Sequence, residues 1–169
     1  IIAKLPKYEL SPETTSGREG FIHPVSVSGG GEKVTLKFII RDFVDTGLAE
    51  KEAYLEKITK EVLLHYKNSS YEFIIEESYR NMKQVLDKYP HVTEYAMEAV
   101  KRTGVTPYKD IIRGGTDGSR LSYMNLPCPN IFTGGHAYHS KLEWISVQNM
   151  QKAVETIIHL VMVWEEKSA

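Results

Sequence analysis

The sequence predicts a chain of mixed architecture, with a small α+β part followed by an α/β part. In the first part, strand, turn, strand, helix and strand patterns follow one another after what reads as the end of a helix. In the second part, short apolar runs alternate with helical patterns, which is typical of a parallel sheet covered by helices. We place the division at residues 1–84 and 85–169, within a junction between about Tyr79 and Pro90.

The N-terminal elements begin with a helix end at residues 1–5, whose earlier turns are not in the chain; this suggests a fragment. Residues 6–20 are rich in turn formers and predict a loop. Residues 21–28 predict a strand, in which Pro24 is tolerated at an edge or a bulge. Three glycines at 29–31 predict a hairpin turn. Residues 33–43 alternate apolar and polar side chains, which predicts the partner strand.

An amphipathic helix is predicted at residues 47–66, because apolar side chains recur there at three- and four-residue steps. A further strand is predicted at residues 71–79. This order is that of a ferredoxin-like α+β sandwich without its first strand and most of its first helix.

The C-terminal elements begin with a helix at residues 91–104, which Gly104 can close. Strands are predicted at residues 106–112 and 130–133. A short helix is predicted at residues 117–124 and a long final helix at 147–166. The alternation favours a parallel sheet.

Composition excludes several classes of function. With 41% apolar and 25% charged residues and a net charge of −1, the chain has neither the basic surplus of a nucleic-acid-binding protein nor an acidic tail. No apolar run approaches the roughly 20 residues that span a membrane. Cys128 is the only cysteine, so no disulfide framework forms within the chain. This suits a reducing compartment, and we expect a cytoplasmic location.

The turn at residues 111–118 (IIRGGTDG) is a candidate anion site, because a glycine-rich strand-to-helix turn presents free backbone N–H groups. Arg113 can grip a carboxylate there, beside Gly114, Gly115, Thr116 and Asp117. The alternative is a plain turn with Asp117 as the helix cap and Arg113 in a surface ion pair.

His139 follows a double glycine at the predicted carboxyl edge of the sheet, where ligands of α/β folds collect. Imidazole is a common metal ligand, and Glu143, four residues on, is placed to accept a hydrogen bond from its other ring nitrogen. The alternatives are a structural histidine and a solvated carboxylate. A catalytic zinc needs about three protein ligands, so any partners of His139 must come from residues outside the chain.

Two further residues are weaker candidates. Arg41 ends an apolar strand and either forms a rim salt bridge, for which Asp42 is a partner, or points into a cleft. Asn81 lies at the junction of the two parts, where it is either a turn former or a lining residue of a cleft.

The ordered motifs EGFIHPVSVSG, FIIRDF, EESYRNM, IIRGGTDGSRLSYMNLPCPNIFTGG and YHSKLEWI closely resemble the C-terminal half of a co-catalytic di-zinc peptidase, specifically a tripeptide aminopeptidase. The resemblance covers essentially the whole chain. It implies a ferredoxin-like lid, which mediates homodimerisation, followed by the C-terminal part of a zinc-peptidase catalytic domain. The family pattern GGxNYHGxxEF is altered here at Ala137 and Ser140.

The resemblance also implies the roles of individual residues. His139 matches the one zinc ligand of the C-terminal half, and Arg113 matches a position that holds the terminal carboxylate of a small peptide. Arg41 and Asn81 match lid or junction positions that reach the substrate. Two zinc ions per full-length subunit are implied, with the general base and the other ligands upstream. We therefore expect the isolated fragment to be inactive.

Two other functions are kept open. One is a related di-zinc dipeptidase or amidohydrolase, which differs in substrate. The other is a non-enzymatic module for dimerisation and anion binding, which the missing ligands motivate. The sequence upstream of Ile1 distinguishes the module from the enzymes.

Overall fold

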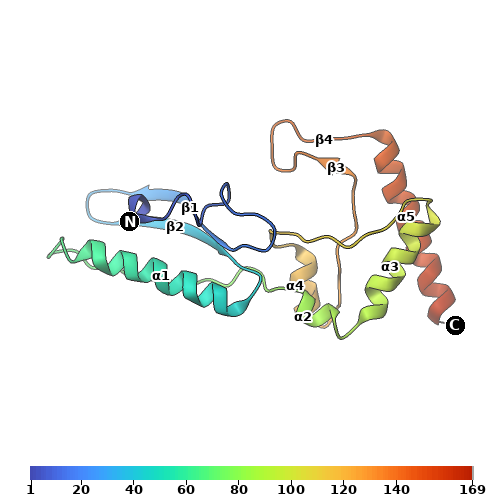
Figure 1. The fold of residues 1–169 in the computed structure, drawn as a ribbon, viewed down its shortest axis with the longest axis horizontal. Coiled ribbons are helices and arrows are strands. Elements are labelled where there is room, and N and C mark those ends of the chain that lie inside the picture. Colours follow the sequence, from blue (N-terminus) through green and yellow to red (C-terminus); the bar gives the residue numbers. More distant parts are fainter. Residues whose placement is uncertain (169) are drawn as a thin grey trace. The chain divides into compact units, whose positions relative to one another are not determined.

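The computed structural model describes residues 1–168, which form two compact units (Figure 1). Unit 1 comprises Ile1–Ser78 with Ile111–Gly114, and unit 2 comprises Tyr79–Asp110 with the chain from Gly115 onward. Helices are combined with small antiparallel sheets, so the α+β class is confirmed. None of the described helices is long and apolar enough to cross a membrane. The predicted domain division at 84/85 stays a prediction.

Unit 1 is built on a hairpin of β1 (Phe21–Gly29) and β2 (Val34–Arg41), as the sequence predicts. A short 3-10 turn, η1 (Ile2–Lys4), precedes it. The register shifts between Pro24 and Ser26, so the proline lies at a bulge where no ladder hydrogen bond is lost. Gly29 turns the chain with φ +136, and a Cβ there would lie 2.1 Å from the carbonyl oxygen of Lys33.

The predicted helix of unit 1 is present as α1 (Asp45–Leu63) and packs against β2 (Figure 1). Ile22, Leu55 and Ile58 are at most 5% exposed and form the core of the unit. Side chains alternate between the two faces of a strand. Phe21, His23, Ile39 and Arg41 therefore share the face opposite to that of Ile22.

Unit 2 contains the three predicted helices and one short additional helix. These are α2 (Lys83–Leu86), α3 (Pro90–Arg102), α4 (Asp117–Tyr123) and α5 (Val147–Ser168). Helix α3 ends before Gly104, whose φ of +80 suits a helix terminator. It packs on α5 around the fully buried Ala99 and Val163. Arg102 joins the two helices through hydrogen bonds of 2.8 and 2.7 Å to the carboxylate of Glu166.

The three remaining predicted strands are wrong. Residues 71–79, 106–112 and 130–133 form no strand, so neither a parallel sheet nor a complete ferredoxin-like sandwich exists within residues 1–168. A strand is stabilised by ladder hydrogen bonds to a neighbour. These segments have suitable side chains but no such partner. Ile74 and Ile75 are accordingly 67% and 58% exposed.

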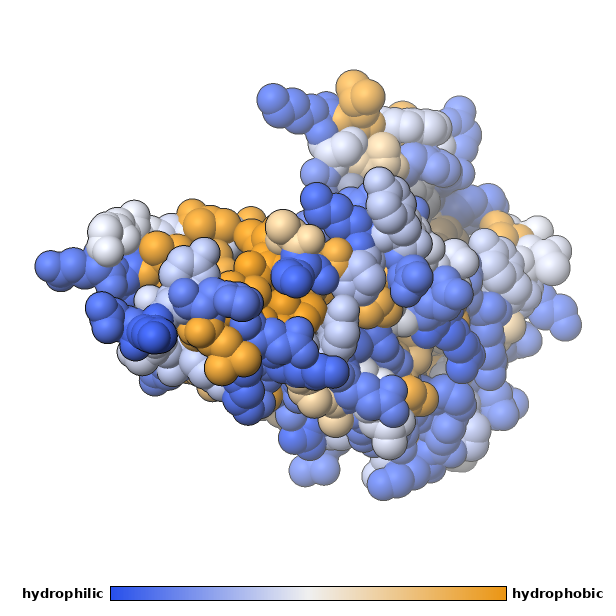
Figure 2. Space-filling model, turned by 60° about the vertical axis from the view of Figure 1, so that its left-hand side comes forward, coloured by the Kyte–Doolittle hydropathy of each residue, from blue (hydrophilic) through white to orange (hydrophobic). Residues whose placement is uncertain are grey.

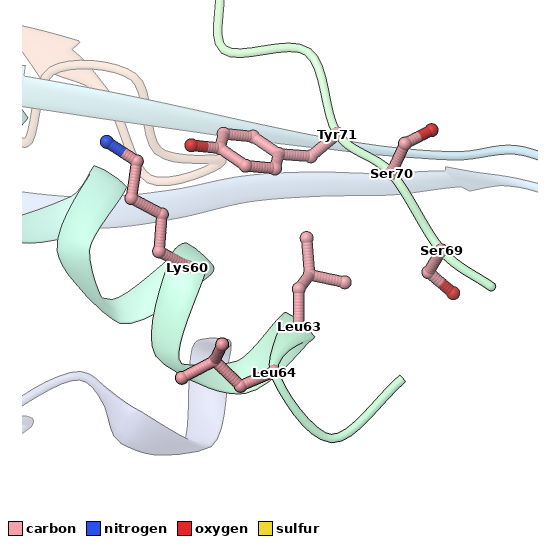
Figure 3. Close-up of a pocket in the computed structure, with 6 residues that line it drawn as sticks. All are labelled: Lys60, Leu63, Leu64, Ser69, Ser70 and Tyr71. Carbon is pink, nitrogen blue, oxygen red and sulfur yellow. The ribbon is translucent and has the colours of Figure 1, made fainter. Parts of the chain in front are cut away.

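Side chains instead hold the start of the segment 71–79 against α1 (Figure 3). Tyr71 donates a hydrogen bond of 3.1 Å to Glu56 of the helix. A pocket of roughly 420 Å³ lies beneath its ring, lined by Lys60, Leu63, Leu64, Ser69, Ser70 and Tyr71. The start of the segment is therefore held to the helix by a side chain, and the segment does not extend the sheet.

Candidate functional site

A pocket of roughly 380 Å³ lies on the face of the hairpin that α1 leaves open. The register explains its floor, because Phe21 lies opposite Arg41 and His23 lies opposite Ile39. The segment 111–114 covers one side of this floor. The pocket is lined by Pro12, Phe21, His23, Ile39, Arg41, Arg113 and Gly114. Two arginines and a histidine thus line one hollow together with apolar side chains.

Arg113 is held in this pocket by the loop that precedes β1. One terminal nitrogen donates to the carbonyl oxygen of Thr15 at 2.7 Å, and the other donates to the Thr15 hydroxyl at 2.7 Å and the Glu19 carbonyl at 3.1 Å. The guanidinium carbon lies 5.3 Å from the centre of the Phe21 ring, within range of a cation–π interaction. The side chain is therefore fixed in position before any ligand arrives.

The Nε of Arg113 is buried and has no hydrogen-bond partner among residues 1–168. A guanidinium has five N–H donors, and the contacts to Thr15 and Glu19 use three of them. An unsatisfied buried donor costs about 1–3 kcal/mol. The arrangement therefore favours an additional acceptor beside Arg113.

Arg41 and Asp42 are neighbours in the chain, but they have different surroundings. Arg41 lines the pocket, whereas the Asp42 carboxylate accepts a 2.6 Å hydrogen bond from Lys51 of α1. Burial raises the pKa of Asp42, but the hydrogen bonds from Lys51 and the Val44 backbone outweigh it, and the pKa is lowered overall. Asp42 thus fixes the strand end that presents Arg41.

The other half of the glycine-rich turn belongs to unit 2. Helix α4 begins at Asp117 as predicted, and its N-cap is Thr116. The Thr116 hydroxyl accepts a hydrogen bond from Asn130 at 3.1 Å. Gly115 lies against the ring of Tyr79, so close that a Cβ would be 2.0 Å from a ring carbon. Its lack of a side chain is therefore a packing requirement.

Asn81 is placed as a turn former. Its side-chain oxygen accepts a hydrogen bond of 3.0 Å from the backbone N–H of Lys83, just inside α2. Its carbonyl oxygen accepts one of 3.0 Å from the Tyr123 hydroxyl. These contacts join the start of unit 2 to α4.

His139 lies exposed in the turn between β3 (Gly135–His136) and β4 (Trp144–Ile145). Its φ of +65 is in the left-handed region, which is rare for a residue with a side chain. Ala137 has a φ of +55. At the base of the hairpin, the rings of His136 and Trp144 stack with centroids 4.3 Å apart. The turn therefore holds the imidazole out toward solvent.

Glu143 supports this turn through the backbone. Its carboxylate accepts a hydrogen bond of 2.9 Å from the backbone N–H of His139. The sequence places Glu143 near His139, but does not indicate that the contact is to the main chain.

Within residues 1–168, no group of three or more His, Cys, Asp or Glu side chains is arranged to hold a metal ion. The exposed imidazole of His139 is a chemically suitable donor for zinc. It can occupy one corner of a tetrahedral site, and the other corners require donors from elsewhere.

The structure brings together some of the predicted residues and not others. Arg41, Arg113 and Gly114 line one pocket of unit 1. The remaining candidates all belong to unit 2: Gly115, Thr116, Asp117, Asn81, His139 and Glu143. Sequence reasoning missed His23. The signal was its two-residue spacing from Phe21, which places it on the face of Arg41 once the hairpin register is known.

No family model matches the chain. Curated relatives named Peptidase T match along nearly its whole length. The relative from Clostridium perfringens (strain 13 / Type A) is 41% identical over 99% of this chain, which covers 41% of that protein. The relative from Aeromonas hydrophila is 44% identical over 90% of this chain, covering 38% of that protein. The relative from Bacillus pumilus is 44% identical over 98%, covering 40%.

The chain thus spans about two fifths of the length of these relatives. Identity above 40% over nearly the whole chain agrees with the ordered motifs, which run from the hairpin of unit 1 to the His139 turn. The chain is therefore similar, along nearly its whole length, to the C-terminal part of these Peptidase T relatives.

Proposed function

We propose that the chain is part of a zinc-dependent aminopeptidase that releases the N-terminal residue of tripeptides. The observation that carries this proposal is the His139 turn, which holds an exposed imidazole in a left-handed backbone conformation within a chain similar to these relatives. Strain of this kind concentrates at functional sites. His139 is the ligand that this chain contributes, and the rest of the two-zinc site comes from the remainder of the protein.

Bound zinc lowers the pKa of a water molecule toward about 7 and polarises the scissile carbonyl. In this proposal, the residues of this chain bind the metal and orient the side chain that binds it. His139 supplies a nitrogen donor, and Glu143 holds the backbone on which the imidazole is mounted. The general base belongs to the part of the protein outside this chain.

In this proposal, the pocket of unit 1 recognises the peptide substrate. Arg113 and Arg41 bind the terminal carboxylate of a small peptide, because two guanidinium groups in one hollow make a strong anion site. Gly114 leaves the pocket rim open, with nothing within 4 Å of the position of a Cβ. Gly115, Thr116, Asp117 and Asn81, which belong to unit 2, stay proposed substrate-binding residues.

We further propose that the full-length protein is a cytoplasmic homodimer. Support for the dimer comes from the hairpin of unit 1, where Val25, Val27 and Val34 are 48–60% exposed. Figure 2 shows hydrophobic side chains gathered on the surface on the side where unit 1 lies. Exposed apolar patches of this kind mark interaction surfaces. The single free thiol of Cys128 suits a reducing compartment.

The test of the function uses the full-length protein and unblocked di-, tri- and tetrapeptides. We expect the highest kcat/KM with tripeptides, loss of hydrolysis with a chelator and recovery with added zinc. Preference for dipeptides or acylated amino acids would favour the related dipeptidase or amidohydrolase. Absence of hydrolysis in the zinc-loaded protein would favour a binding module.

A further inference from the structure

We propose that His23 is a third ligand-binding residue of the arginine pocket, where it donates a hydrogen bond to the terminal carboxylate of a peptide. This inference rests on the proposed function and deepens it. It assigns substrate recognition to a residue of β1 that faces the same hollow as Arg41 and Arg113.

The position of His23 follows from the register of the hairpin. His23 lies opposite Ile39, and two residues away Phe21 lies opposite Arg41, so these four side chains emerge from the same face. Arg113 lies over the Phe21 ring at 5.3 Å. His23 is therefore the next residue on this face of β1 after Phe21, which is paired with Arg41 and lies against the guanidinium of Arg113.

Imidazole chemistry suits this position. A neutral imidazole has one N–H donor and a charged one has two, so His23 offers a donor in either state. Arg113 is already held by Thr15 and Glu19, which leaves fewer of its donors for a ligand. An additional donor in the pocket increases the number of hydrogen bonds that a carboxylate can accept.

The pocket therefore selects a free carboxylate over a neutral amide. A carboxylate accepts hydrogen bonds at both oxygens, whereas the NH₂ of an amide would meet other donors. His23 contributes to this selection without taking part in the chemistry of the scissile bond.

The experiment compares His23→Ala with wild type in the full-length protein, using a tripeptide and its C-terminal amide. Loss of a hydrogen bond to a charged group should raise KM for the acid by roughly tenfold, with little change in kcat. The amide should be affected much less. His23→Asn should restore part of the lost affinity, because its side chain retains N–H donors. His65→Ala, an exposed histidine of the same unit, is the matched control and should behave as wild type.

Calorimetric binding of an N-acetylated dipeptide acid and its amide gives a second readout that does not depend on turnover. His23→Ala should reduce the preference for the acid by roughly tenfold, because both arginines remain. Equal affinity losses for acid and amide, or an unchanged acid preference in both assays, would overturn the role of His23. If the wild-type protein hydrolyses no peptide but His23→Ala still weakens its preference for the acid in calorimetry, the proposed function is overturned and the role of His23 is supported.

Discussion

The carboxylate of Glu143 accepts a hydrogen bond from the backbone N–H of His139 at 2.9 Å. The contact spans a four-residue turn in which both His139 and Ala137 have positive φ. Left-handed backbone costs a residue with a Cβ about 1–2 kcal/mol. The hydrogen bond stabilises this conformation and so determines where the imidazole is presented.

Replacement of Glu143 should therefore weaken metal binding without removing a ligand. We expect Glu143→Ala to lower zinc affinity and kcat/KM of the full-length protein by about 10–100-fold, as for other residues that orient a metal ligand. Glu143→Gln should have a smaller effect because its amide oxygen still accepts the hydrogen bond. Competition with a chromophoric chelator measures the affinity. Glu165→Ala on the exposed side of α5 is the control, and equal behaviour of the two alanine variants would contradict this role.

Gly114 and Gly115, in the turn at residues 111–118, should respond differently to substitution. A Cβ at Gly115 would lie 2.0 Å from the Tyr79 ring, whereas nothing lies within 4 Å of one at Gly114. Gly115→Ala should therefore lower the free energy of unfolding by about 1–3 kcal/mol through overpacking. Gly114→Ala should change it by less than about 0.5 kcal/mol. Urea denaturation of the full-length protein measures both, and a similar loss in the two variants would contradict the packing described here.

Asp42 and Lys51 should contribute stability that depends on pH. Their side chains are only 9% and 15% exposed and are 2.6 Å apart. Removal of one partner leaves a buried charge unpaired, so Asp42→Asn should lower the free energy of unfolding by about 3 kcal/mol at neutral pH. The exposed pair Lys57–Glu61, 3.9 Å apart, is the control, and its removal should cost less than about 1 kcal/mol.

The pH dependence of this pair follows from the lowered pKa of Asp42. In the unfolded chain an aspartate titrates near about 3.9. The contribution is therefore fully present above that value and is lost as pH falls through the lower pKa of the folded state. The difference between wild type and Asp42→Asn should be constant from about pH 5 to 8 and shrink below about pH 4. A difference that grows on acidification would contradict this assignment.

Local patterns were sufficient to predict α1, α3, α4, α5 and the β1–β2 hairpin, but not the short helix α2. Helix α3 and its termination at Gly104 follow from periodicity and a glycine with positive φ. The bulge at Pro24 follows from the missing N–H of proline. These features depend on residues close together in the chain.

The wrong strands show what periodicity leaves undetermined. Residues 71–79 have the side chains of a strand, yet Ile74 and Ile75 remain exposed because no neighbouring strand pairs with them. A pattern of apolar residues indicates which side chains favour burial. It does not supply the partner that buries them.

The sequence was sufficient to identify the candidate residues of the site, but not the contacts that they make. Arg113 and Arg41 were identified as anion-binding candidates, and both line one pocket. The bonds of Arg113 to Thr15 join residues 98 positions apart, which no local pattern encodes. The contact of Glu143 to a backbone N–H likewise depends on the left-handed turn, which the sequence alone did not reveal.

The most direct test of the account is the zinc content of purified full-length protein carrying His139→Ala, compared with His136→Ala. Both histidines are exposed and lie in the same hairpin, but only His139 is assigned as a ligand. We predict that His139→Ala loses stoichiometric zinc and tripeptide hydrolysis, while His136→Ala retains both. Wild-type zinc content with undiminished hydrolysis in His139→Ala would contradict the central claim.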